Sequence, residues 1–136
     1  MDTTLRISRS LADQIVSEAM RSPLEICGLL LGRDDAVEAI QPCANVHATP
    51  ATHFEIDPAA LFGALRAARG GGPAVIGHYH SHPSGSALPS ATDAESAHAD
   101  RAIWIVVAGV RITAWRAVRD GAVHGRFDPL ALAIAP

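Results

Sequence analysis

Three histidines and an aspartate mark the stretch of this chain that is best equipped for chemistry. The run is His78-Tyr79-His80-Ser81-His82-Pro83, and Ser90 and Asp93 follow a few residues later. Imidazoles separated by one residue project from the same side of an extended backbone, because side chains alternate across a strand. Two histidines and one aspartate around an open fourth position make a catalytic zinc shell. The spacing therefore predicts one Zn²⁺ per chain, held by His80, His82 and Asp93.

Glu25 and His78 are two further residues that could take part in the metal site. Glu25 stands at the mouth of an apolar run, residues 26–31, where a glutamate is unusual because it is rarely buried without a partner. We expect it to complete the site as a proton shuttle; the alternative is that it is the solvated end of a strand. His78 shares a face with His80, but three neighbouring histidines would crowd one ion. We therefore expect His78 beside the metal site and not as a ligand.

Asp93 has a structural alternative as well. Ser90-x-x-Asp93 is the pattern of a capping box, in which both side chains satisfy free backbone N–H groups at the start of a helix. A carboxylate committed to a cap is less available to a metal ion, so the two interpretations compete. Spacing alone does not decide between them.

The rest of the sequence predicts alternating strands and helices. Helical spacing predicts a helix from Ser10 to Met20, opened by Ser10 with Asp13. A second helix begins at Asp57-Pro58 and ends at Gly70, and a third covers residues 90–100. Strands are predicted at 5–7, 26–31, 36–41, 53–56, 74–80, 103–107, 110–116 and 122–126, with a tight turn at Asp120-Gly121 and a helical turn or tail at 130–134. This order indicates an α/β fold with a mixed β-sheet flanked by helices, in a single domain over residues 1–136.

Composition narrows the classes of partner. A net charge of -3 gives no basic footprint, so we expect no nucleic acid, and the longest apolar run, residues 102–110, is too short to span a membrane. The first residues lack the pattern of a signal peptide, so we expect a cytoplasmic protein. Cys27 and Cys43 lack the paired spacing of a structural zinc site and are expected to be reduced thiols.

Taken together, these residues resemble a known motif. Glu25, then His80-Ser81-His82-Pro83, six residues, Ser90, two residues and Asp93 match the fixed elements of the JAMM motif of the JAMM/MPN-plus zinc metalloproteases. Residues 25–32 also resemble the first strand of compact bacterial members, and residues 54–58 resemble their entry to the second helix. The resemblance covers residues 5–127, and it implies a cytidine-deaminase-like core.

The resemblance also implies roles and a substrate. His80, His82 and Asp93 would be the zinc ligands, Glu25 would hold and deprotonate the attacking water, and Ser90 would stabilise the oxyanion. Members of the family cleave peptide or isopeptide bonds after the C-terminal Gly-Gly of ubiquitin-like proteins. Because this chain has little room for long inserted loops, a small ubiquitin-like or sulfur-carrier protein is the expected substrate.

Two other functions share these residues. A non-catalytic MPN scaffold has the same fold without the metal, although such relatives lack motif residues and none is missing here. A non-haem iron oxygenase also uses two histidines and a carboxylate, but it would leave Glu25 without a task. The sequence indicates neither the oligomeric state nor whether the bond cleaved is a linear peptide, an isopeptide or a cysteinyl adduct.

Overall fold

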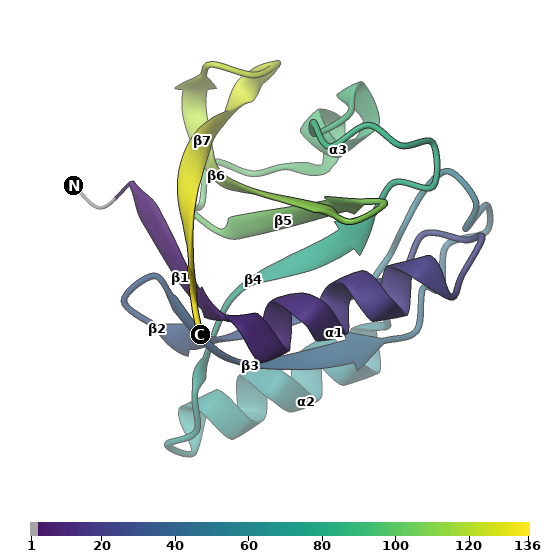
Figure 1. Cartoon of the computed structure of the whole chain (residues 1–136). Helices are drawn as coiled ribbons and strands as arrows, with labels where there is room; N and C mark the ends of the chain where they lie inside the picture. The colour runs from purple at the N-terminus through teal and green to yellow at the C-terminus, as the bar shows by residue number, and fades with distance from the viewer. Residues whose placement is uncertain (1–2) are drawn as a thin grey trace.

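The computed structural model describes residues 3–136, which form a sheet and three helices (Figure 1). The predicted order of elements is confirmed over most of the chain, with strand bounds that differ from the prediction by a few residues. In chain order the elements are β1 (Thr4–Ser8), α1 (Arg9–Met20), β2 (Cys27–Arg33), β3 (Ala36–Cys43), α2 (Pro58–Arg69), β4 (Ala74–Ser81), α3 (Ala91–Ser96), β5 (Ile103–Ala108), β6 (Arg111–Gly121) and β7 (Gly125–Ala135).

The sheet is mixed, as predicted, but it also closes on itself. Its strand order is β1-β3-β2-β4-β5-β6-β7, and β1 pairs with both β7 and β3. The pairs β1–β3, β1–β7 and β4–β5 are parallel and the others are antiparallel. The β1–β3 closure consists of one register pair, Arg6 with Ala36, so the ring is nearly open at that point. Closure from both ends of the chain was not foreseen from the sequence.

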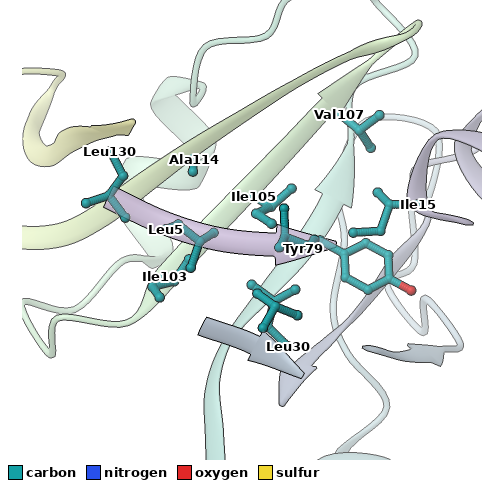
Figure 2. Packing of buried hydrophobic residues seen from close by; sticks show 11 residues of the cluster. Leu5, Ile15, Leu30, Tyr79, Ile103, Ile105, Val107, Ala114 and Leu130 are labelled. Carbon is teal, nitrogen blue, oxygen red and sulfur yellow. The ribbon is translucent and has the colours of Figure 1, made fainter. Parts of the chain in front are cut away.

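The main core lies between α1 and the inner face of this sheet. Leu5, Ile15, Leu30 and Ile105 are fully buried there and point toward one another, together with the ring of Tyr79 (Figure 2). Each such aliphatic side chain contributes roughly 1.5–3 kcal/mol by leaving water. Strand β4 carries the histidines, and the core therefore fixes it between β2 and β5.

Three predicted elements differ from the structure in their start, their end or their existence. Helix α1 is capped by Ser8, whose side chain accepts a hydrogen bond from the Leu11 N–H, so the predicted start at Ser10 is wrong by two residues. Helix α3 stops at Ser96 instead of reaching residue 100, because Ala97 already has an extended backbone. The predicted strand at 53–56 is absent; its only pairing is a single bridge between Asn45 and Ile56.

The C-terminal region differs most from the prediction. The chain reverses at residues 122–124, just after the predicted turn, and β7 runs from Gly125 to Ala135 instead of 122–126. Residues 130–134 are neither a helical turn nor a tail, since Ala131 to Ala135 pair with β1. Leucine and alanine alternate there with the period of a strand. Because both residues are apolar, the hydrophobic pattern does not reveal that period. No helix among residues 3–136 is long and apolar enough to cross a membrane.

Candidate metal centre and catalytic cleft

The histidine strand is held on both sides. His80 pairs with Cys27 of β2 and with Val106 of β5, and the N–H of His82 donates to the Val107 carbonyl over 2.9 Å just past the end of β4. The period of two places both imidazoles on one face, as predicted. His80 is fully buried in the ladder of β4, and His82, 7% exposed, is held just beyond the strand by its bond to Val107.

Asp93 reaches the same point from the first turn of α3. Its Oδ2 atom lies 3.1 Å from Nε2 of His80 and 3.1 Å from Nε2 of His82. The same Oδ2 accepts the Ser90 N–H over 2.9 Å, while the Ser90 Oγ accepts the Asp93 N–H over 3.0 Å, which completes the capping box. The two interpretations of Asp93 therefore do not compete. One carboxylate caps the helix and faces the histidines, and the cap fixes its rotamer.

The three polar atoms have the spacing that a metal ion needs. The two Nε2 atoms lie 3.0 Å apart, so they form a nearly equilateral triangle with the Asp93 oxygen. A tetrahedral zinc ion with bonds of about 2.0–2.1 Å requires ligand atoms about 3.3 Å apart. Among residues 3–136 this is the one group of three or more such side chains close enough to hold a metal ion. The donor set and its size fit zinc with one position left open.

Hydrogen bonds orient one of the two imidazoles. Nδ1 of His82 lies 2.8 Å from the Ser86 carbonyl, and only a protonated Nδ1 can donate to that oxygen. Nε2 of His82 therefore turns its lone pair toward the metal group, which is the tautomer that a ligand needs. Nδ1 of His80 is buried without a hydrogen-bond partner among the described residues. His80 is positioned instead by the Phe54 ring, which stacks on it at 4.2 Å.

The metal group contains an ionised carboxylate, as a site for a cation requires. Burial by itself would raise the pKa of Asp93, but the His80 and His82 imidazoles beside it and the hydrogen bond from the Ser90 N–H hold that pKa below its usual range. Burial lowers the pKa of His80. For His82 the burial effect is outweighed by Asp93 and the Ser86 carbonyl, which raise its pKa. A carboxylate is thus kept ionised in a buried site.

Glu25 opens into the same cleft. A cavity of about 390 Å³ is lined by Glu25, by His82 of the metal group and by Ser90. Glu25 is 7% exposed, and within residues 3–136 its carboxylate accepts no hydrogen bond. Burial raises its pKa to about 7, against a lowering effect of His82 and with a further rise from Asp93. Glu25 is therefore not a solvated strand end.

His78 lies outside the metal group. Its ring is 4.3 Å from the Trp104 ring and 5.6 Å from the Phe54 ring, and its Nδ1 is buried without a partner among the described residues. Burial lowers the pKa of His78 to about 3. It packs behind His80 in an aromatic cluster. Sequence reasoning missed Phe54 and Trp104 at this site, since two separated aromatic residues give no spacing signal.

Comparisons with known proteins agree with this geometry. Residues 8–119 match the model of a family described as prokaryotic homologs of the JAB domain. The chain is 39% identical over 100 residues to a desampylase of Haloferax volcanii, which covers 68% of this chain and 72% of that protein. It is 40% identical over 94 residues to a probable TtuB-protein conjugate cleaving protease of Thermus thermophilus, covering 68% of this chain and 63% of that protein.

A solved structure has the same fold. It is described as a metalloprotease-like JAMM zinc site in the proteasome and signalosome, and it superposes with a TM-score of 0.58 over 98% of this chain and 100% of that chain. Sequence identity is 20%, so this likeness bears on the fold alone. The fold, the family match and the metal group were each reached from different observations.

Proposed function

The chain belongs to the family of prokaryotic homologs of the JAB domain, and on that premise we propose that it is a zinc-dependent isopeptidase. The proposed reaction hydrolyses the bond after the C-terminal Gly-Gly of a ubiquitin-like or sulfur-carrier protein. One observation carries it: a buried group of two imidazoles and a carboxylate, sized for zinc, borders through His82 a cleft that Glu25 also lines. The relatives named desampylase and TtuB-conjugate protease support the substrate class.

Five side chains have roles in this proposal. His80, His82 and Asp93 would hold the ion, and a zinc ion bound there supplies Lewis acidity that polarises the scissile carbonyl and acidifies water. Glu25 takes the proton of the attacking water and returns it to the leaving amine. Ser90 uses only a lone pair of its Oγ in the capping box, so its hydroxyl proton is free to donate to the oxyanion.

The pKa of Glu25 suits that task. A general base works best when its pKa lies near the working pH, and burial raises the Glu25 pKa to about 7. The carboxylate is then a stronger base than an exposed glutamate, and the glutamic acid formed can still release its proton to the amine. The overall change is one water consumed, with one carboxylate and one protonated amine released.

Three broader assignments accompany the proposal. A single domain over residues 1–136 is supported by a sheet that joins the first described strand to the last. A cytidine-deaminase-like core is supported by a metal group formed at a strand end and the first turn of a helix. A cytoplasmic location is supported by Cys27 and Cys43, which face each other across β2 and β3 as free thiols.

Replacing Glu25 tests the function directly. The substrate is a ubiquitin-like protein joined through its Gly-Gly terminus to a lysine side chain of a reporter peptide. We expect Glu25→Gln to keep one zinc per chain and to lose roughly 10²–10⁴-fold in kcat, the usual contribution of a general base. Glu55→Gln is the matched control, because Glu55 is exposed and does not line the cleft.

Three results would contradict the proposal. A wild-type protein that binds zinc but cleaves no such conjugate would be a scaffold and not an enzyme. A Glu25→Gln variant with wild-type turnover would leave the assigned base without a role. Iron in place of zinc, with oxygen uptake, would indicate oxygenase chemistry instead.

A further inference from the structure

Glu25 precedes the sheet, so strand pairing does not fix it. Strand β2 begins at Cys27, and the backbone groups of Glu25 and Ile26 therefore need other partners. The Glu25 N–H donates to the Pro50 carbonyl over 2.8 Å. The Ile26 N–H donates to the Ser81 Oγ over 2.9 Å, and the Ser81 N–H returns a bond to the Ile26 carbonyl over 3.1 Å. The Glu25 carbonyl accepts from the side-chain amide of Asn45 over 2.9 Å.

Asn45 uses its whole hydrogen-bonding capacity in this position. Its Nδ2 donates to the carbonyls of Glu25 and His53, both over 2.9 Å. Its Oδ1 accepts the N–H groups of His47 and Glu55, both over 3.1 Å. An asparagine amide offers two N–H donors and two acceptor lone pairs, and here all four are used. An aspartate would keep the two acceptor positions and lose both donors.

The segment that Asn45 organises is also a wall of the cleft. Ala51 and Thr52 line the cavity that Glu25 enters, and Pro50 of the same segment accepts the Glu25 N–H. The Glu25 backbone is thus joined to residues 46–53 at two points. The Asn45 side chain bridges the Glu25 and His53 carbonyls, and the Pro50 carbonyl accepts the Glu25 N–H. The Glu25 carboxylate itself has no hydrogen bond within residues 3–136, so its place in the cleft depends on where its backbone is held.

We propose that Asn45 is a positioning residue for the reaction. It holds the Glu25 carbonyl against the cleft wall, and so it keeps the carboxylate directed at the attacking water. This inference rests on the proposed function, in which Glu25 is the general base. A displacement of a reacting group by about 1 Å can cost on the order of 10²-fold in rate, so the loss of this one donor should be measurable in kcat.

Asn45→Asp tests the inference with the smallest change of shape. We expect kcat to fall about 10–100-fold, since Glu25 remains present but less well placed. Zinc content and KM should stay as in the wild type, because the metal group and most of the cleft are untouched. Thr49→Val is the matched control: it removes hydroxyl contacts to His47 and His53 within the same segment and leaves Asn45 bonded to Glu25.

A double-mutant cycle separates positioning from a general loss of structure. If Asn45 acts through Glu25, Asn45→Asp should change the residual kcat of Glu25→Gln by less than about twofold. An equal loss in both backgrounds would overturn the inference, and so would a wild-type kcat for Asn45→Asp alone. A wild-type rate for Glu25→Gln would contradict the proposed function itself.

Amide exchange of the metal-free protein gives a readout that needs no activity. Asn45→Asp should speed exchange at the Glu25 and Ile26 amides by at least about tenfold, because the segment opens locally. The amides of Leu29 to Leu31, inside β2, should keep their wild-type rates. Unchanged exchange at Glu25 and Ile26 would show that Asn45 does not hold this segment, whatever the kinetics.

Discussion

The two sides of the cleft are built by different means. The metal group rests on regular structure: β4 lies between β2 and β5, and the capping box of α3 fixes Asp93. Glu25 lies outside the strands, in a segment held by Asn45, Ser81 and the Pro50 carbonyl. The metal group is therefore fixed by ladders of hydrogen bonds and a helix cap, whereas the proposed base depends on a few individual hydrogen bonds.

This difference suits the two tasks. Three ligand atoms must stay within a few tenths of an ångström to bind one ion, which favours a packed strand and a capped helix. A general base has to reach a water and then a leaving amine, so it belongs on a segment that borders the cleft. Substitutions on the first side should remove the metal, and those on the second should reduce the rate with the metal in place.

Asp93→Asn should have the largest effect. Asparagine can still accept the Ser90 N–H, so α3 keeps its cap, but the negative charge that faces both imidazoles is lost. We expect zinc affinity to fall by more than about 100-fold, beyond the 10–100-fold typical of groups that only support a ligand. Zinc content after dialysis and turnover of the conjugate measure this. Asp13→Asn, on the exposed face of α1, is the control; a zinc-replete Asp93→Asn variant would contradict the ligand assignment.

Ser90→Ala should come next, and α1 offers its control. Ser90 and Ser8 both cap helices, each accepting a backbone N–H over 3.0–3.1 Å. Either change to alanine should cost about 1 kcal/mol of stability through the lost cap. Only Ser90→Ala should also lower kcat, by roughly 10²–10³-fold, if its hydroxyl donates to the oxyanion. Urea unfolding and steady-state kinetics on both variants give the comparison, and equal kcat values would limit Ser90 to the cap.

The better predicted side is the one built from regular structure. The histidine pair, the strand at 74–80 and the start of α2 at Asp57-Pro58 follow from period-two spacing and capping chemistry, which act over a few residues. Asp93 was harder, because the same spacing predicts a cap and a ligand. In the structure the Asp93 Oδ2 contacts both the Ser90 N–H and the His80 imidazole, and residue spacing along a sequence cannot show such a shared contact.

On the side built from individual hydrogen bonds, the sequence pointed to Glu25 but gave no signal for the residue that holds it. Asn45 lies in a stretch that reads as an ordinary loop, and its partners come from both ends of that loop and from Glu25, 20 residues upstream. The closure of the sheet was missed for a related reason. The partner of residues 131–135 is β1, at the other end of the described chain, and both faces of that last strand are apolar.

His78→Phe should have the smallest effect on zinc binding and turnover, and its effect on stability should appear only at acid pH. Folded His78 stays neutral down to a pKa of about 3, whereas the unfolded side chain binds a proton near pH 6.5. Unfolding therefore takes up a proton between these values, and this group makes the metal-free protein less stable as the pH falls from about 6.5 to 3. Phenylalanine binds no proton, so the variant should lose about 1.4 kcal/mol less stability per pH unit within that window.

Urea unfolding of the two metal-free proteins at pH 6, 5 and 4 measures this difference. His80 and His82 are present in both proteins, so the difference between the two pH dependences reports mainly the loss of His78. Phenylalanine keeps an aromatic ring beside Phe54 and Trp104, the two rings that His78 contacts. Zinc binding and kcat should then be unchanged at neutral pH, as expected of a side chain behind the metal group. Parallel pH dependences would mean that folded His78 is protonated and that it reaches water or an anionic partner.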